Sequence, residues 1–167
     1  TYDSDFAAQK LMSKHPLIIQ QLKELFGTDV YINQALNKAL LAEKIFNNQS
    51  LLNQVNKIVH PLVWEDMKAW RKKQNTSIVF IEAAILIESD LYLTLDKNIL
   101  ITAPLELKIE RIKTRNKHLS EEDILNRINN QLSDKEKEKH CDYFIINDEK
   151  QALIPQVLKI INSLKQK

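Results

Sequence analysis

The sequence predicts an α/β fold in which helices flank a parallel sheet. Three short apolar runs rich in β-branched residues, 77–87, 98–102 and 143–146, have the composition of strands that are covered on both faces. Helical patterns follow the second and third runs, at 105–115 and 151–164. Strands that alternate with helices along a chain pair in parallel through right-handed crossovers, and we therefore predict a parallel sheet.

The first half of the chain is predicted to be helical. A helical pattern starts at residues 6–12 with no strand before it. Pro16 then suits the first turn of a helix that ends at Gly27, the only glycine of the sequence. Both helices precede the first predicted strand.

Further helices are expected before residue 75. Ser50 is the expected N-cap of one of them, and His60 with Pro61 is expected to break it. No strand pattern appears in this part of the chain. We interpret residues 16–75 as a helical insert within one domain that spans residues 1–167.

A polar, charge-dense segment covers residues 115–140. Within it, Ser120 with Asp123 and Ser133 with Glu136 have the spacing of capping boxes, which predicts two helix starts. We interpret this segment as a mobile lid.

Composition excludes several classes of protein. The 167 residues carry 24 Lys and Arg against 22 Asp and Glu, and a net charge of +2 does not indicate a nucleic-acid-binding surface. The single cysteine, Cys141, excludes an internal disulfide framework and a cysteine-rich metal site. No apolar run has the length of a membrane span, and the first residues do not show the basic and then apolar pattern that directs secretion. We therefore expect a cytoplasmic protein without a membrane partner.

Two aspartates near the start of the chain are candidates for catalysis. Asp3 and Asp5 alternate around Ser4, and if this segment ends a strand, both carboxylates lie at the sheet edge where α/β proteins bind ligands. Either carboxylate could then serve as a general base. The alternative is that Asp3 or Ser4 only caps the following helix.

A basic helix face is the second candidate. Lys108, Arg111 and Arg115 follow one another at helical spacings, and arginine binds phosphate oxygens with two hydrogen bonds at once. Such a face next to a lid suits phosphoryl transfer. The alternative is a solvated face on which Glu106 and Glu110 are the intrahelical partners.

Two acidic residues and one histidine are weaker candidates. Glu82 and Glu88 bracket an apolar run, where a carboxylate belongs either to a site edge or to a structural ion pair. His60 could face a cleft at the expected helix break, although a lone histidine is more often structural. We expect no protein metal site, because no ligand spacing is present.

In their order and spacing, segments along almost the entire chain resemble the dephospho-coenzyme A kinases. The matching segments are Tyr2-Asp3-Ser4-Asp5, Phe26-Gly27, Leu36-Asn37-Lys38, Ile58-Val59-His60-Pro61, Glu82-Ala83-Ala84-Ile85-Leu86-Ile87-Glu88, Arg111 with Arg115, Ser120-Glu121-Glu122, Arg127-Ile128, Gln131, and Asp142 with Ile146-Asn147. The resemblance implies a P-loop kinase fold, with a parallel sheet, flanking helices, a helical substrate-binding insert and a lid.

The resemblance also implies the reaction and its participants. The γ-phosphoryl group of ATP, bound with Mg²⁺, would pass to the ribose 3′-hydroxyl of dephospho-coenzyme A, the last step of coenzyme A synthesis. Asp5 would be the base, and Asp3 would support the substrate or the magnesium shell. The implied ATP-binding residues are Arg111, Arg115 and Asn147. The implied residues of the acceptor pocket are His60, Lys38 and Glu88.

One motif of the family is not in the sequence. In these kinases a strand and a loop of the form GxxxxGKS precede the segment that corresponds to Asp3, and a chain with one glycine contains no such loop. We therefore expect the chain by itself to be inactive. Two alternatives stay open: another P-loop nucleoside or nucleotide kinase, and a module that binds a coenzyme A-like ligand without catalysis.

Overall fold

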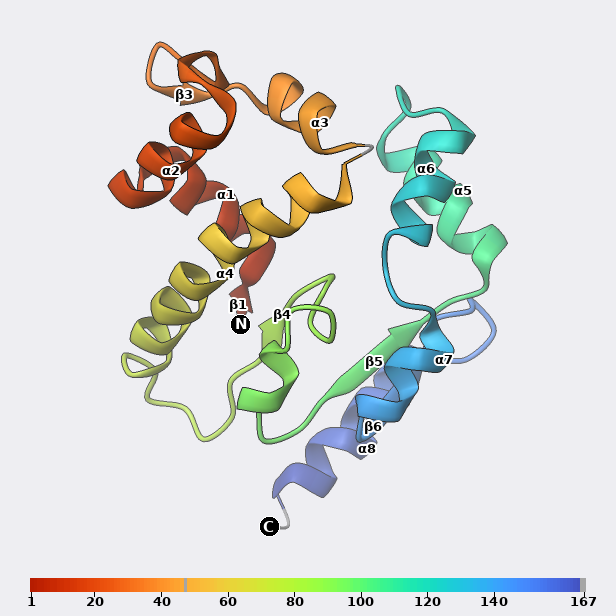
Figure 1. Ribbon diagram of the computed structural model, residues 1–167. Helices are drawn as coiled ribbons and strands as arrows, with labels where there is room; N and C mark the ends of the chain where they lie inside the picture. The colour runs from red at the N-terminus through yellow and green to blue at the C-terminus, as the bar shows by residue number, and fades with distance from the viewer. Residues whose placement is uncertain (47, 166–167) are drawn as a thin grey trace. The chain divides into compact units, whose positions relative to one another are not determined.

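The computed structural model describes residues 1–46 and 48–165, which form two compact units, Thr1–Ala84 and Ile85–Lys167. Asn47, in the polar stretch before the predicted cap Ser50, lies outside the described residues. Strands pair in parallel within each unit and helices pack against them, which confirms the predicted α/β class (Figure 1).

The first unit contains short strands and long helices. Its elements are β1 (Tyr2–Asp3), α1 (Ser4–Lys14), α2 (Pro16–Phe26), the 3-10 turn η1 (Thr28–Val30), β2 (Tyr31–Ile32), β3 (Ala35–Leu36), α3 (Lys38–Phe46), α4 (Gln49–Arg71) and β4 (Ile81–Glu82). The parallel pair β1–β4 sets Tyr2 beside Ile81 and Asp3 beside Glu82. The predicted end of α2 at Gly27 is confirmed, and the positive φ of 88° at this residue is one that glycine adopts without strain.

The core of the first unit forms around α4. Its buried residues recur every four positions, which places them on one helix face: Val55, Val59, Val63 and Met67. That face packs against α1, α2 and α3. The buried Tyr2 anchors β1 to the same helix, because its hydroxyl donates to Asp66 Oδ2 at 2.8 Å and its ring lies 5.4 Å from that of Trp70.

The strands of the first unit differ from the prediction. Tyr2–Asp3 is a strand, which meets the condition set for the sheet-edge interpretation of Asp3 and Asp5, although no strand was predicted before the helix at 6–12. Only Ile81–Glu82 of the predicted strand 77–87 is paired. The predicted all-helical insert also contains the antiparallel hairpin β2–β3. Its turn residues, Asn33 and Gln34, have φ values of 50° and 67°, the positive values that a tight hairpin turn requires.

Helix α4 also corrects two predictions. Pro61 lies inside it without ending it, because the valine face on both sides of the proline remains buried and compensates for the lost hydrogen bond. The N-cap is Asn48 instead of Ser50, since Asn48 Oδ1 accepts from the backbone N–H of Leu51 at 3.0 Å.

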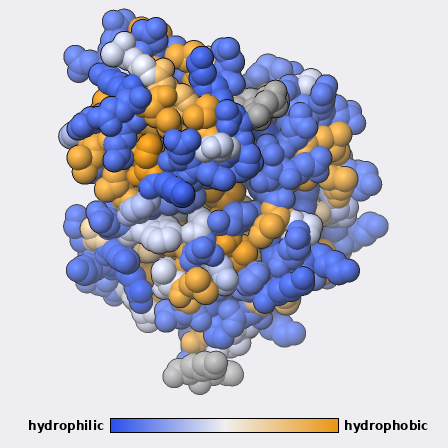
Figure 2. All heavy atoms as spheres, viewed as in Figure 1, coloured by the Kyte–Doolittle hydropathy of each residue, from blue (hydrophilic) through white to orange (hydrophobic). Residues whose placement is uncertain are grey.

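The second unit is built on the parallel pair β5–β6. Its elements are the 3-10 turn η2 (Leu91–Thr94), β5 (Ile99–Thr102), α5 (Leu105–Arg115), α6 (Glu121–Asn129), α7 (Asp134–Lys137), the 3-10 turn η3 (Glu138–His140), β6 (Tyr143–Ile146) and α8 (Leu153–Lys165). Leu100 and Ile145 are buried in this sheet, whereas the alternating Ile101 and Phe144 are 62% and 48% exposed. Hydrophobic residues are visible among the hydrophilic ones on the face of the molecule that Figure 2 shows.

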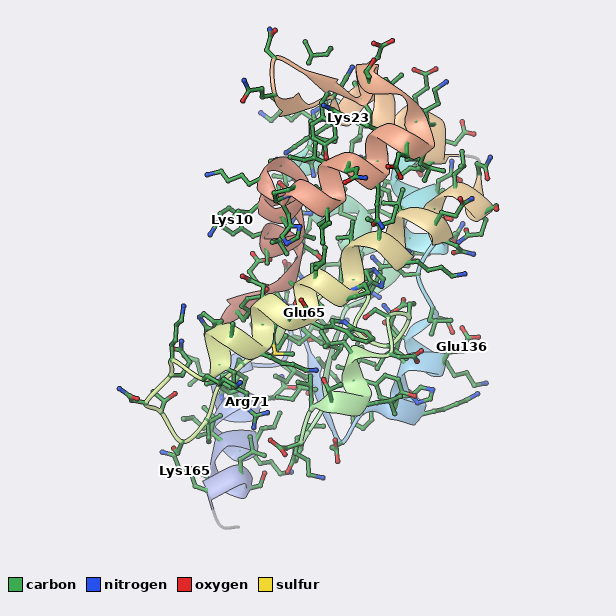
Figure 3. The ribbon with its side chains drawn as sticks, turned by 60° about the vertical axis from the view of Figure 1, so that its left-hand side comes forward. Lys10, Lys23, Glu65, Arg71, Glu136 and Lys165 are labelled. Atoms are coloured by element: carbon green, nitrogen blue, oxygen red, sulfur yellow. The ribbon has the colours of Figure 1, made fainter. Side chains whose placement is uncertain are left out.

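Both predicted capping boxes are confirmed. Ser120 and Asp123 close one at the start of α6, and Ser133 and Glu136 close the other at the start of α7, where Glu136 is labelled in Figure 3. Within residues 1–46 and 48–165, none of the helices is both long enough and apolar enough to cross a membrane.

Candidate functional site

Asp3 and Asp5 stand at the carboxyl end of β1. Asp3 is the last strand residue and also the N-cap of α1, because its Oδ1 accepts from the backbone N–H of Phe6 at 2.8 Å. Asp5 follows in the first helical turn, where the positive end of the helix dipole favours a carboxylate. The capping alternative is therefore correct for Asp3, and the same residue still lies at the ligand-binding edge of a parallel pair.

The electrostatics of this edge favour a base at Asp5. Partial desolvation raises the pKa of the Asp5 carboxyl, and the charge of Asp3 raises it further against an opposing hydrogen bond from the backbone of Ala84. A carboxylate with a raised pKa binds a proton more readily than an ordinary aspartate. Glu82, paired in register with Asp3, adds a third acidic residue at this end of the strands.

The described residues contain no cluster of three or more His, Cys, Asp or Glu side chains with the geometry of a metal site. A cation that needs only one or two protein carboxylates, such as Mg²⁺ bound to phosphates, remains compatible with Asp3 and Asp5.

The two other candidates of the first unit lie on different helices. Lys38, the first residue of α3, is exposed, and its Nζ donates to Gln9 Oε1 of α1 at 3.2 Å. His60 is half-buried in α4, and burial lowers the pKa of its imidazole. Among the described residues, no hydrogen bond or ion pair joins His60 to Lys38 or to the aspartates. The structure therefore places Lys38 against α1 and His60 on a separate helix.

Arg111 and Asn147 are brought together in the second unit. Arg111 Nη1 donates to the backbone carbonyl of Asn147 at 3.2 Å, and Nη2 donates to Asn147 Oδ1 and to Glu149 Oε1, each at 3.1 Å. Asn147 directly follows β6, and its backbone N–H donates to Thr102 O at 2.8 Å, so it extends the sheet by one residue. An α5 side chain thus meets the carboxyl end of the parallel strands.

The other residues of the basic face behave differently. Lys108 Nζ lies 2.7 Å from Asp134 Oδ2 of α7, and Thr102 at the end of β5 donates to the same oxygen. Arg115 is exposed and makes no hydrogen bond or ion pair within the part of the chain that the structure describes. Lys108 and Arg111 therefore pair with Asp134 and Glu149 from other parts of the chain. The intrahelical partners that the sequence suggested were Glu106 and Glu110.

Glu88 belongs to a buried ion pair, one of the two alternatives that its position in the sequence left open. Its Oε1 lies 3.2 Å from Lys137 Nζ and accepts from the backbone N–H of Leu132 at 2.9 Å. Lys137 is only 8% exposed, which is rare for a lysine outside an ion pair. The capping box at Ser133 locates the helix that carries Lys137, but no local pattern identifies Glu88 as its partner.

Comparison with known proteins gives a consistent result. The family model described as dephospho-CoA kinase matches residues 1–152. A dephospho-CoA kinase of Bacteroides fragilis is 40% identical over 167 residues, covering 99% of this chain and 81% of the relative. The corresponding protein of Porphyromonas gingivalis is 32% identical over 166 residues, covering 99% of this chain and 82% of the relative.

Solved structures agree with the sequences. The crystal structure of TT1252 from Thermus thermophilus has a TM-score of 0.83 at 25% identity and covers 97% of this chain and 82% of its own. The structure of dephospho-CoA kinase from Campylobacter jejuni has a TM-score of 0.63, also at 25% identity, with 99% and 84% covered.

Proposed function

The chain belongs to the dephospho-CoA kinase family, and on that premise we propose how its own side chains carry out the transfer of the ATP γ-phosphoryl group to the ribose 3′-hydroxyl of dephospho-CoA. The observation that carries the proposal is the position of Asp3 and Asp5 at the carboxyl end of β1, where the pKa of the Asp5 carboxyl is also raised. The remaining roles follow from the contacts of each residue.

Asp5 is the general base. Its carboxylate takes the proton of the 3′-hydroxyl as the oxygen forms a bond to the γ-phosphorus, and the bond from that phosphorus to the bridging oxygen breaks to release ADP. The causes that raise the pKa of Asp5, desolvation and the Asp3 charge, bring its basicity closer to that required at neutral pH.

Asp3 is the group that would hold Mg²⁺ with ATP, while Asp5 stays free to act as the base. Magnesium binds oxygen ligands, and one or two carboxylates together with substrate phosphates are sufficient. Bound there, the ion would neutralise charge that develops on the phosphates. Asp3 remains the N-cap of α1, which keeps its carboxylate at the end of the strand.

Arg111, Arg115 and Asn147 are proposed to bind the nucleotide. A guanidinium has five N–H donors, and three of those of Arg111 are used in its bonds to Asn147 and Glu149. Two donors are then left for phosphate oxygens. Arg115, exposed four residues later on the same helix, supplies a second guanidinium. Asn147 keeps its side-chain N–H donors for the adenine, because Arg111 occupies only its oxygens.

Lys38, His60 and Glu88 are proposed to contact the acceptor. Lys38 supplies a flexible positive charge suited to a phosphate group of dephospho-CoA. The lowered pKa of His60 keeps its imidazole neutral near pH 7, so it both donates and accepts hydrogen bonds without adding charge.

The test is a direct phosphorylation assay on a protein that contains this chain together with a GxxxxGKS loop, because the chain by itself is expected to be inactive. The protein is incubated with Mg²⁺, radiolabelled ATP and dephospho-CoA, and the product is identified by mass spectrometry. We expect label on dephospho-CoA and none with the Asp5→Asn variant. Transfer to AMP or adenosine in preference to dephospho-CoA would assign a different kinase, and binding of dephospho-CoA without transfer would assign a binding module.

A further inference from the structure

A buried lysine at the end of α7 holds the carboxylate of Glu88. The side chains of Lys137 and Glu88 are only 11% and 18% exposed, and the ion pair between Nζ and Oε1 is supported by the backbone N–H of Leu132 on the same oxygen. Two donors on one carboxylate oxygen, one charged and one from the backbone, fix the rotation of the group. The Glu88 carboxylate is therefore held in one orientation by two groups that both contact Oε1.

The other carboxylate oxygen is arranged differently. Oε2 of Glu88 is buried and accepts no hydrogen bond from the residues that the structure describes. Leaving a buried polar atom unpaired costs free energy, so native proteins rarely retain such an atom without a function. Oε2 can accept a hydrogen bond from a ligand once the residues that cover it move, because no described residue already occupies it.

Lys137 is itself fixed by its surroundings. Gln131 Oε1 accepts a hydrogen bond from its Nζ at 3.1 Å. The helix that carries it is only four residues long, but it is anchored at its start by the capping box of Glu136 (Figure 3) and by the ion pair of Asp134 with Lys108. Rotation of the Glu88 carboxylate would therefore require residues 131–137 to change conformation.

We propose that Lys137 is a positioning residue for the acceptor substrate: it orients Glu88 so that Oε2 accepts a hydrogen bond from a hydroxyl or amide donor of dephospho-CoA. The inference rests on the role proposed above for Glu88. Lys137, Gln131 and Leu132 all lie within residues 115–140, the predicted lid, so the conformation of this segment sets the orientation of an acceptor-binding group.

The experiment compares three variants of the protein that carries this sequence. Lys137→Met removes the charge, Lys137→Arg keeps it, and Lys135→Met is the matched control on an exposed lysine of the same helix. Calorimetry gives the affinity for dephospho-CoA and for ATP, and steady-state kinetics give KM and kcat. We expect Lys137→Met to weaken dephospho-CoA binding by about tenfold, the scale of a lost hydrogen bond to a charged group. ATP affinity and kcat should change little, Lys137→Arg should restore most of the binding, and Lys135→Met should change nothing.

A double variant separates positioning from simple destabilisation. Lys137→Met leaves a buried carboxylate without its ion-pair partner, which can destabilise the fold. Lys137→Met combined with Glu88→Gln removes both charges, so the double variant avoids an unpaired buried charge and its binding can be measured. In the Glu88→Gln background, Lys137→Met should weaken dephospho-CoA binding no further, because Lys137 acts through Glu88. Additive losses, or equal losses for ATP and dephospho-CoA, would overturn the inference.

The failures are distinguishable. Binding of dephospho-CoA that is unchanged by Glu88→Gln removes the proposed role of Glu88 and this inference with it. Weaker binding in Glu88→Gln but not in Lys137→Met overturns the inference alone. A wild-type protein that binds dephospho-CoA without phosphorylating it contradicts the proposed reaction, while the calorimetric comparison still decides the role of Lys137.

Discussion

Arg111 binds both oxygens of Asn147, the backbone carbonyl through Nη1 at 3.2 Å and the side-chain Oδ1 through Nη2 at 3.1 Å. This pair of hydrogen bonds joins α5 to the residue that follows β6. The planar fork of arginine makes such a two-point contact possible, and lysine cannot reproduce it.

Arg111→Lys is therefore expected to impair nucleotide binding although the charge is kept. We expect KM for ATP to rise by about tenfold or more, because hydrogen bonds to charged groups contribute about 1.5–3 kcal/mol. KM for dephospho-CoA should change less. Steady-state kinetics with each substrate varied in turn provide the measurement, and Lys117→Ala, at an exposed lysine beyond the end of α5, is the control. An unchanged KM for ATP would remove Arg111 from the nucleotide site.

Asp5→Asn is expected to abolish most of the activity without destabilising the fold. Loss of a general base lowers kcat by roughly two to four orders of magnitude. Because the folded state raises the pKa of Asp5, the ionised carboxylate is disfavoured by folding above that pKa, and removing its charge should not lower the free energy of unfolding at neutral pH. Urea unfolding and activity are measured on Asp5→Asn and on Asp29→Asn, an exposed control. Near-normal kcat in Asp5→Asn would refute the assignment of the base.

The pH dependence of kcat should report the environment of Asp5. Desolvation and the charge of Asp3 raise the pKa of Asp5. As the pH is lowered, kcat should therefore begin to fall at a higher pH than the pKa of an ordinary aspartate would give, because the base becomes protonated. Asp3→Asn removes the second cause and should move this acid limb to lower pH, with desolvation still holding it above the ordinary value. Asparagine keeps an oxygen that can accept from Phe6 N–H, so the helix cap is preserved. If the acid limb of the kcat profile does not move in Asp3→Asn, and circular dichroism shows an intact fold, the charge of Asp3 does not raise the pKa of Asp5.

The cap of α4 can be tested by stability alone. Asn48→Ala removes the acceptor for Leu51 N–H and should lower the free energy of unfolding by about 1 kcal/mol. Ser50→Ala, two residues later, should change it by less than about 0.5 kcal/mol, as surface substitutions usually do. Both are measured by urea unfolding monitored by circular dichroism. A larger loss of stability in Ser50→Ala than in Asn48→Ala would show that Ser50 is the N-cap, as the sequence pattern predicted.

Local patterns determined much of this structure. The helix from Pro16 to Gly27 and the capping boxes at Ser120 and Ser133 were predictable because proline, glycine and a serine three residues before an acidic residue act through the nearest backbone groups. Pairing of the strands at 99–102 and 143–146 was predictable from their apolar, β-branched composition. The family was recognisable from the order of short motifs along the chain.

Tertiary contacts decided the rest. Helix α4 continues through Pro61 because its valine face is buried, a gain that local propensity does not include. The ion pairs of Lys108 with Asp134 and of Lys137 with Glu88 join residues that are 26 and 49 positions apart in the sequence. Charge spacings of three or four residues predict only pairs within one helix and cannot identify such distant partners. The sequence by itself determined the fold class, the end of α2, the starts of α6 and α7 and the candidate groups. Only the folded chain decided where α4 begins and which charges meet, because burial and distance are properties of the packed chain.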